Sequence, residues 1–490
     1  MKAPASHQVF LAVDLGAESG RVMAASYDGS TLKLEEVNRF ANGPITHDGH
    51  LHWDIDSLYS HILDGLKRAA KTYGSQIKSI GIDTWGVDYG LLDKNDELIT
   101  PPYHYRDARN DGMAEAIFKR IPAADLYTAT GIQTLPFNTI FQLEAERQQN
   151  PERLTKARKL LHIPDLLAFW LTGQATSEHT IASTGQMLYP GEMRWNADLL
   201  EQLELPTHLL QTLIAPGKTL SSITKAVQDQ TGLPAVPVVA SAGHDTASAV
   251  AGTPGQGNHW AFLSSGTWSL LGVELQHAVT TEAAQAANFS NEAGVDGTTR
   301  FLKNIAGLYL LQECRKTWQE QDGQPIDYAD LTAQAAAAPA LTATFDPQDP
   351  RLVKPGKMPT RIRDVIAESG QPIPEDRATL ARVILESLAY CYRAFINQLE
   401  ALSDRHIDTI IVVGGGSRNH LLNQMIADAT GRTVVAGPAE ATALGNAAVQ
   451  MIAAGTFKDL AEARLAIDQS FPGTTFTPQN TAAWDALDPA

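Results

Sequence analysis

The sequence predicts an α/β protein built from two similar halves. Short apolar runs alternate with longer segments of helical spacing, as expected for sheets covered by helices. A turn with glycine and hydroxyl side chains lies between two strand-like runs near the start of the chain, and a similar turn follows just past its middle. The chain has 490 residues, which at roughly 150 residues per domain is too long for one core.

The first half opens with three adjacent strands joined by tight turns, which predict a meander. Asp28-Gly29-Ser30 marks the second turn. We expect a helix next, capped by Asp56 or Ser57 and ended by Gly74. The strands are expected at residues 9–14, 22–27, 32–40 and, after the helix, 77–83.

The first turn combines groups that suit a metal–phosphate ligand. Gly16 and Gly20 leave backbone N–H groups open to an anion, while Asp14, Ser19 and Arg21 add an acid, a hydroxyl and a guanidinium. The alternative is a plain hairpin turn.

Two loops of the first half suit a polyol. Residues 84–88 and 105–109 set aromatic rings beside Asp and Arg side chains. A surface aromatic beside an ion pair explains the same pattern equally well. Further on, residues 154–173 are predicted to form one helix.

Asp245 lies between the halves. The apolar run 236–240 predicts a short buried strand, and the Ala-rich segment after Asp245 predicts a helix. Asp245 would then lie where the carboxyl end of a strand meets a helix, a common place for chemistry in open α/β sheets. Alternatively, Asp245 has only a structural role, and its side chain caps the helix by accepting a hydrogen bond from the N–H of Ala247 or Ser248.

The second half repeats the outline of the first. We expect strands at 260–264 and 268–274 around Ser265-Gly266-Thr267, then an irregular region that includes the Ala-rich residues 335–338. A strong helix over 380–399 precedes a strand at 409–413, three glycines at 414–416, a helix from Asn419, a strand at 433–435 and a helix at 440–451. A strand that runs into three glycines suits a nucleotide lying across bare backbone.

Composition excludes several classes of protein. The net charge of −17 argues against nucleic acid or an anionic membrane as a partner. No run approaches about 18 apolar residues, and Met1–Ala5 hold no signal-peptide core, so we expect a cytoplasmic protein. Cys314 and Cys391 are too far apart for a Cys-x-x-Cys motif. Thr212 breaks a P-loop ending at Thr219, and Ser417 and Asn419 break a dinucleotide fingerprint.

The combination favours phosphoryl transfer. Two lobes, each with a phosphate-facing hairpin, would close on a nucleoside triphosphate at their junction. This chemistry needs positioning, charge stabilisation and one carboxylate that accepts the proton of the attacking hydroxyl. Because both phosphate-facing turns occur in the same chain, Asp245 is expected to be that carboxylate rather than a helix cap.

The motifs resemble the FGGY family of carbohydrate kinases over residues 9 to 455. Each piece is short, and their combination is specific. The matching pieces are Ala12-Val13-Asp14-Leu15-Gly16, Ser19-Gly20-Arg21, Gly81-Ile82-Asp83-Thr84-Trp85-Gly86-Val87-Asp88, Tyr105-Arg106-Asp107, Gly131-Ile132-Gln133, Leu135-Pro136-Phe137-Asn138-Thr139, His244-Asp245-Thr246-Ala247-Ser248-Ala249-Val250, Leu263-Ser264-Ser265-Gly266-Thr267-Trp268-Ser269-Leu270, Leu302-Lys303-Asn304-Ile305, Gly307-Leu308, Leu310-Leu311-Gln312 and Val413-Gly414-Gly415-Gly416.

The resemblance implies an actin-like ATPase fold of two duplicated, ribonuclease-H-like domains, residues 1–245 and 246–490, with a nucleotide cleft between them. It also implies ATP- and Mg²⁺-dependent phosphorylation of L-rhamnulose at its 1-hydroxyl by a monomer or small homo-oligomer. By the same resemblance Asp245 is the proton acceptor and Asp14 the Mg²⁺-associated acid, acting through water. The implied ATP contacts are Ala17, Glu18, Ser19, Gly20, Arg21, Thr267, Gln312 and Gly415, and the implied sugar contacts are Gly86, His244, Asp245, Thr246 and Asn304.

One segment departs from the wider family. That family usually has Lys, and three residues later Trp, where this chain has Thr139 and Gln142. The departure weakens a generic pentulose- or glycerol-kinase interpretation, whereas the branch that acts on L-rhamnulose is similar here. A kinase for L-fuculose or L-ribulose stays open as an alternative, as does an inactive sugar-binding module of the same fold.

Overall fold

The computed structural model describes residues 8–487, so the interpretation of Met1–Ala5 lies outside the described residues. The chain divides into two compact units that are not continuous in sequence. The first holds residues up to Pro254, Glu274–Phe301 and Ala441–Phe471; the second holds Gly255–Val273, Leu302–Glu440 and the segment from Pro472. The predicted boundary after residue 245 stays a prediction.

A six-stranded sheet in the order β11-β12-β6-β1-β2-β3 organises the first unit. β1 pairs antiparallel with β2, as does β2 with β3, which confirms the meander, while β6 runs parallel to both β1 and β12. The strands are β1 (Gln8–Leu15), β2 (Ser19–Tyr27), β3 (Leu32–Ala41), β6 (Ile77–Thr84), β11 (Lys218–Ser222) and β12 (Pro237–Ala240).

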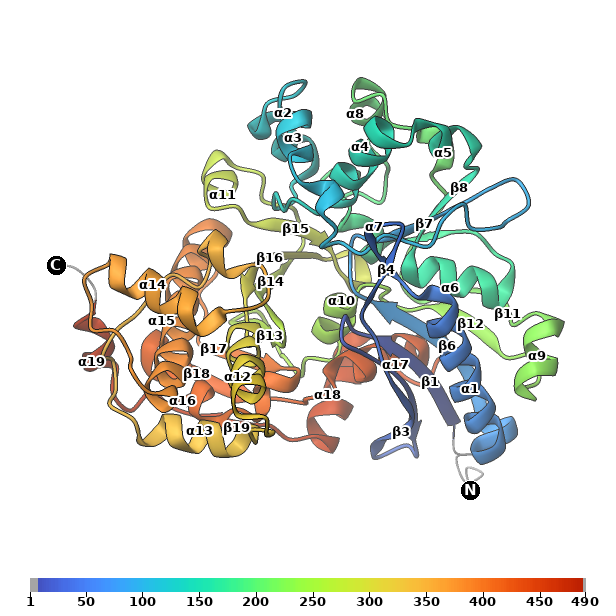
Figure 1. Cartoon of the computed structure of the whole chain (residues 1–490). Coiled ribbons are helices and arrows are strands. Elements are labelled where there is room, and N and C mark those ends of the chain that lie inside the picture. Colours follow the sequence, from blue (N-terminus) through green and yellow to red (C-terminus); the bar gives the residue numbers. More distant parts are fainter. Residues whose placement is uncertain (1–7, 488–490) are drawn as a thin grey trace. The chain divides into compact units, whose positions relative to one another are not determined.

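Helices cover both faces of this sheet. Val9, Leu11 and Val13 pack into one core with α1 (Ile55–Tyr73) and α6 (Ile163–Thr172). Phe10, from the opposite face of β1, packs with α17 (Ala441–Ala453) and α18 (Leu460–Ser470), so each face of the strand has its own core. Figure 1 shows α1 and α17 on opposite sides of β1, although about 370 residues of chain, from Tyr73 to Ala441, separate them.

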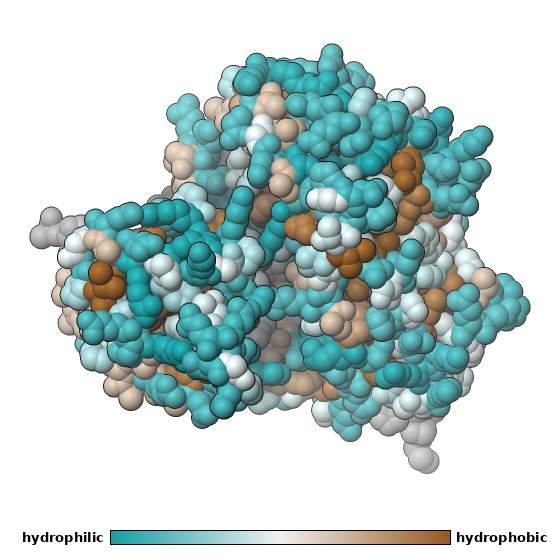
Figure 2. All heavy atoms as spheres, viewed as in Figure 1, coloured by the Kyte–Doolittle hydropathy of each residue, from teal (hydrophilic) through white to brown (hydrophobic). Residues whose placement is uncertain are grey.

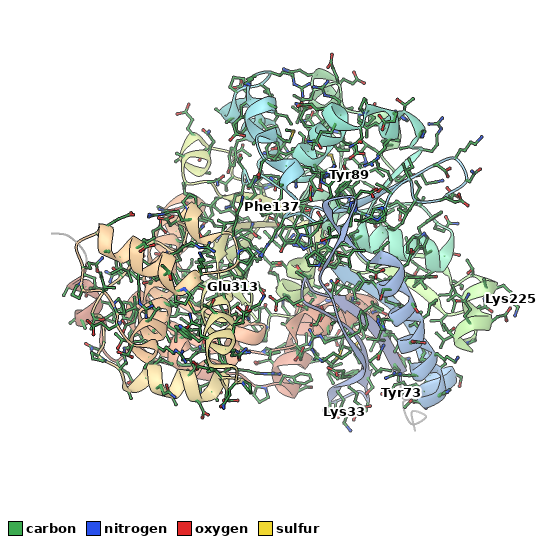
Figure 3. All side chains as sticks on the ribbon, viewed as in Figure 1. Lys33, Tyr73, Tyr89, Phe137, Lys225 and Glu313 are labelled. Carbon is green, nitrogen blue, oxygen red and sulfur yellow. The ribbon has the colours of Figure 1, made fainter. Side chains whose placement is uncertain are left out.

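A helical region follows β7 (Tyr89–Leu92) in the first unit and has its own core, which includes Tyr89 (Figure 3). Its elements, together with the remaining small elements of this unit, are β4 (Pro44–His47), β5 (His50–Trp53), α2 (Met113–Phe118), α3 (Ala123–Thr130), α4 (Thr139–Gln149), α5 (Pro151–Lys156), β8 (Lys159–His162), β9 (Ser177–Glu178), α7 (His179–Ser183), α8 (Ala197–Gln202), β10 (Leu213–Ile214), α9 (Lys225–Thr231), α10 (Asp245–Ala251), α11 (Glu282–Ala286) and β15 (Ser290–Ala293).

The second unit repeats the strand order of the first. Its strands belong to a sheet ordered β15-β16-β14-β13-β17-β18-β19, where β13 pairs antiparallel with β14 and parallel with β17, and β18 runs parallel to β17. This matches β3-β2-β1-β6-β12 and confirms the predicted duplication. The elements are β13 (Trp260–Ser265), β14 (Trp268–Leu275), β16 (Thr299–Ala306), α12 (Tyr309–Asp322), α13 (Tyr328–Ala337), α14 (Met358–Glu368), α15 (Arg377–Ser403), β17 (Thr409–Val413), α16 (His420–Thr430), β18 (Thr433–Ala436), β19 (Thr474–Phe476) and α19 (Thr481–Asp485).

Several local expectations are wrong. Asp54, not Asp56 or Ser57, caps α1 by accepting from the N–H of Ser57. The single helix expected over 154–173 is α5, strand β8 and α6, with Pro164 in the first turn of α6, where proline is tolerated. The β4–β5 hairpin precedes α1, and the irregular region contains β15, β16 and α12 to α14.

The surface carries few large apolar side chains. Hydrophilic residues predominate on the face in Figure 2. The exposed large apolar residues among those described are Ile45, Met193, Val353, Ile373 and Leu465. Within residues 8–487 no helix has the length and apolar character needed to cross a membrane. Both cysteines are free and buried.

Candidate active site

Asp245 is the first residue of α10, directly after the loop that leaves β12. His244 occupies the N-cap position, and its side chain makes no capping bond. The Asp245 carboxylate instead accepts a hydrogen bond from Thr246 Oγ1 at 3.1 Å, and 31% of its side chain is exposed. The helix-cap alternative is therefore wrong, and the Asp245 side chain is mostly buried but still partly accessible from solvent.

The loop before Asp245 is fixed by a buried carboxylate. Glu178 accepts from the N–H of Gly243 at 2.9 Å and from the N–H groups of Thr180 and Ile181 at the start of α7. A Cβ on Gly243 would lie 2.9 Å from Glu178 Oε2, so glycine is needed for this approach. Asp245 is thus carried by a rigid backbone, as a positioned base requires.

Burial raises the pKa of Asp245, while His244 and Thr246 oppose that rise. The His244 Nε2 atom lies 3.3 Å from Asp245 Oδ1. A carboxylate with a raised pKa is a better proton acceptor than an ordinary surface carboxylate. The electrostatics of Asp245 therefore suit a general base.

Two acids lie side by side at the ends of parallel strands β1 and β6. Asp14 is opposite Arg21 on β2, to which it is paired, and opposite Asp83 on β6. Burial and then repulsion by Asp14 raise the pKa of Asp83 well above its ordinary value. The Asn446 amide donates to Asp83 Oδ2 at 2.5 Å, whereas Oδ1 is buried with no hydrogen-bond partner. Asp83 lies in the motif Gly81–Asp88, but the residue pattern alone predicts no role for it.

This pair of oxygen donors fits a magnesium ion. Mg²⁺ typically takes one or two protein carboxylates and completes its shell with water and substrate phosphates. Among residues 8–487 no group of three or more His, Cys, Asp or Glu side chains is gathered for a metal.

The turn between β1 and β2 has a defined shape. The Gly16 N–H donates to Ser19 O at 2.9 Å, and the Asn42 side chain donates to Gly16 O at 2.8 Å. Glu18 is exposed at the tip, and Ala17 and Ser19 are partly exposed. A Cβ on Gly20 would lie 2.2 Å from the Phe40 ring, so packing already explains this glycine.

The turn at Gly86 is strained. Val87 has a φ of 69°, which is rare for a β-branched residue, and the Asp88 N–H donates back to Gly86 O at 2.9 Å. Thr184 Oγ1 accepts from the Val87 N–H at 3.0 Å, and Thr139 Oγ1 donates to Val87 O at 2.6 Å. A γ-turn of this kind persists only where its surroundings hold it.

Asp88 gathers the aromatic side chains around this turn. Its carboxylate is fully buried and accepts from the indole N–H of Trp53 at 2.6 Å, from that of Trp85 at 3.0 Å and from the Gln142 amide at 2.8 Å. Phe137, labelled in Figure 3, lies 5.3 Å from the Tyr105 ring, centroid to centroid. The surface-aromatic alternative is wrong for Trp85 and Tyr105, since both are buried.

In the second unit, the turn between β13 and β14 contacts the start of α12. Backbone N–H groups of Leu308 and Tyr309 donate to Gly266 O at 3.0 Å and to Thr267 O at 3.2 Å. A Cβ on Gly307 would lie 2.8 Å from both oxygens. Thr267 is therefore fixed beside α12, which carries Gln312, whose Oε1 is buried without a hydrogen-bond partner.

The glycine triplet contacts the same hairpin. A Cβ on Gly414 would lie 2.9 Å from Ser265 O, and a Cβ on Gly416 would lie 2.0 Å from Ser265 Oγ. Gly415, in contrast, is exposed and faces open space. Asn304 lies on β16, where its carbonyl accepts from the Gln348 amide at 3.3 Å. Thr267, Gln312 and Gly415 thus belong to connected parts of one unit, while Ala17 to Arg21, Gly86 and His244 to Thr246 belong to the other.

The chain matches the FGGY family of carbohydrate kinases in both of its domains. Residues 9–252 match the N-terminal domain of that family and residues 261–454 match the C-terminal domain. The rhamnulokinase of Bacteroides thetaiotaomicron is 46% identical over 98% of this chain and 98% of its own length. The rhamnulokinase of Enterococcus faecalis is 44% identical over 96% of this chain and 94% of its own length.

Solved structures agree on the fold. A ligand-bound xylulose kinase from Lactobacillus acidophilus superposes with a TM-score of 0.80 at 17% identity, covering 98% of this chain and 96% of that one. Plasmodium falciparum glycerol kinase with ADP gives 0.78 at 15% identity, covering 99% of both chains. These likenesses confirm the actin-like ATPase fold. With both family domains matched and close relatives over nearly its whole length, this chain belongs to the FGGY family of carbohydrate kinases.

Proposed function

We propose that this chain phosphorylates L-rhamnulose at its 1-hydroxyl with ATP and Mg²⁺, giving L-rhamnulose 1-phosphate and ADP. The observation that carries the proposal is the identity of 46% to a rhamnulokinase over 98% of both chains. Such a protein would act in L-rhamnose catabolism in the cytoplasm, as a monomer or small homo-oligomer.

In the proposed reaction, the sugar 1-oxygen forms a bond to the γ-phosphorus as the bond from that phosphorus to the β,γ-bridging oxygen breaks. Asp245 accepts the proton of the 1-hydroxyl, and its raised pKa supports this role. Mg²⁺, when bound with ATP, would neutralise developing phosphate charge. Asp14 would hold that ion through water, with Asp83 as its neighbour.

The remaining residues are proposed to bind the sugar or ATP. Gly86, His244, Thr246 and Asn304 contact the sugar, and the strained Gly86 turn with its buried aromatic support favours a fixed sugar-binding surface. The ATP contacts are proposed to be Ala17, Glu18, Ser19, Gly20, Arg21, Thr267, Gln312 and Gly415.

A coupled assay of ADP release from Mg-ATP, run across L-rhamnulose, L-fuculose, L-ribulose, D-xylulose and glycerol, tests the proposal. We expect the highest kcat/KM with L-rhamnulose. Preference for L-fuculose or L-ribulose would support the phosphoryl transfer but assign a different sugar as the substrate. No turnover with any of the five would favour the inactive sugar-binding module.

A further inference from the structure

A buried cluster of charged side chains lies directly behind the proposed base. It consists of His244, Glu292 on β15 and Arg300 at the start of β16, where the strand still belongs to the first unit. Their side chains are 9%, 5% and 0% exposed. Burying a guanidinium this completely is costly unless charged and polar partners compensate it. No motif in the sequence marks Glu292 or Arg300.

The cluster forms a chain of contacts that ends on Asp245. Arg300 Nη2 lies 3.2 Å from Glu292 Oε2 and donates a hydrogen bond to His244 Nδ1 at 3.2 Å. On the other side of the imidazole, His244 Nε2 lies 3.3 Å from Asp245 Oδ1. A guanidinium only donates, so Nδ1 accepts and the proton of a neutral His244 lies on Nε2. That proton faces the proposed base.

Both charged residues are themselves held in place. Arg300 Nε donates to Ala293 O at 2.9 Å, and Glu292 Oε1 accepts from Ser290 Oγ at 3.1 Å. Although burial raises it, the Arg300 guanidinium brings the pKa of Glu292 down to about 2, so this carboxylate stays charged. Glu292 Oε2 also lies 3.3 Å from His244 Nδ1, where it would accept a proton if Arg300 did not occupy that nitrogen.

We infer that Glu292 and Arg300 are positioning residues that act through His244. Arg300 keeps the imidazole proton on Nε2, Glu292 fixes Arg300, and the Nε2–H group orients the carboxylate of Asp245. The inference rests on the proposed role of Asp245 as proton acceptor. The competing explanation is that the ion pair merely stabilises the β15–β16 strands.

The first test reads the tautomer of His244 without substrate. Long-range ¹H–¹⁵N correlation spectra of ¹⁵N-histidine-labelled protein, assigned with a His244→Gln sample, should show the Nε2–H form. Arg300→Gln should move the proton to Nδ1, where Glu292 accepts it, and Arg300→Lys should retain the Nε2–H form. An Nδ1–H tautomer in the wild type, or no change in Arg300→Gln, overturns the inference even if L-rhamnulose is not the substrate.

The second test uses turnover and covers the case in which Arg300→Gln does not fold. Glu292→Gln, which preserves side-chain shape, should lower kcat about 10- to 100-fold, because misplacing a reacting group by about 1 Å can cost about 100-fold. In an Asp245→Asn background the same change should cost less than about threefold, since coupled residues are non-additive. Equal losses in both backgrounds would show that the cluster acts independently of Asp245.

A matched control lies at the other end of α10. Arg464 Nη2 donates to Val250 O at 2.8 Å and to Glu274 Oε2 at 2.7 Å, and both charged side chains are mostly buried. Arg464→Gln should lower the melting temperature but leave kcat within about threefold of wild type. A kcat loss in this control as large as that in Glu292→Gln would favour the purely structural explanation.

Discussion

At the scale of single residues, Val87 shows what the sequence conceals. A valine at φ 69° costs about 1–3 kcal/mol of backbone strain, and nothing in the residue type predicts that angle. Thr139 and Gln142, the two departures from the wider family, contact Val87 O and the Asp88 carboxylate. The departure was visible in the sequence, but the turn that these residues hold was not.

The first residue-scale prediction concerns Asp245. Asp245→Asn preserves the shape and the acceptor for Thr246 Oγ1 but removes the group that would take the proton. We expect L-rhamnulose binding, measured by calorimetry, to stay within about threefold and kcat to fall at least about 100-fold, the lower range for general-base catalysis. Near-normal turnover would remove Asp245 from its proposed role.

In the glycine triplet, the effect of a glycine on nucleotide binding can be measured separately from its effect on packing. Gly415 is exposed with no neighbour near its missing Cβ, whereas a Cβ on Gly416 would lie 2.0 Å from Ser265 Oγ. Gly415→Ala should therefore melt like the wild type while raising the KM for ATP about tenfold, equivalent to ~1.4 kcal/mol of lost binding.

Gly416→Ala is the matched comparison and should lower the melting temperature itself. An unchanged KM for ATP in Gly415→Ala would show that the nucleotide does not approach this glycine, whatever Gly416→Ala does.

At the scale of elements, hairpins and long helices were predictable and short buried elements were not. The two glycine turns, the β17 strand and α15 follow from apolar runs and helical spacing. Residues 159–162 form β8 rather than the middle of a helix, because pairing with β7 overrides an ambiguous apolar run. Helical spacing also identified α17, but not the sheet it covers.

The crossing of α10 and α17 gives an element-scale prediction. A Cβ on Gly445 would lie 1.8 Å from Ser248 O, and one on Gly252 would lie 2.1 Å from Ala441 O. Gly445→Ala should gain about 1 kcal/mol in helix propensity yet destabilise the protein by a net ~1–3 kcal/mol through overpacking. Thermal unfolding measures the change.

Because α10 begins with Asp245, kcat should fall in the same variant. Ala453→Val, on the exposed end of α17, adds carbon atoms where nothing is packed and should shift stability by no more than about 0.5 kcal/mol. A stabilised Gly445→Ala would mean that the helices separate easily, and that the glycines are not what sets their spacing.

At the scale of the whole molecule, two sheets of matching strand order are linked by a chain that returns to the first unit. Ala441–Phe471 belong to that unit, and Asn446 and Gln450 of α17 make buried hydrogen bonds to Asp83 and Ser79. The two similar glycine turns, between β1 and β2 and between β13 and β14, predicted the repeated strand order. The return of Ala441–Phe471 to the first unit was not predictable. Helical spacing shows that a helix has an apolar face, but not which sheet that face packs against.

Charge also acts on the whole molecule, and it predicts a pH dependence. Burial, and then the nearby Glu178, raise the pKa of Asp165 well above its ordinary value. The native state therefore holds a proton that the unfolded chain has already released above about pH 4. Stability from this group falls as pH rises toward the native pKa, by up to ~1.4 kcal/mol per pH unit. The net charge of −17 at pH 7 adds self-repulsion in the same direction.

Asp165→Asn isolates this effect, because its amide keeps the acceptor for the Glu178 N–H and cannot ionise. Urea unfolding midpoints at pH 6 and pH 8 should differ less in this variant than in the wild type, with the variant gaining relative stability at pH 8. The exposed Asp56→Asn change removes the same charge and should leave the wild-type difference between the two pH values. If Asp165→Asn also leaves that difference unchanged, Asp165 is ionised in the native state and the acidic surface accounts for the pH dependence.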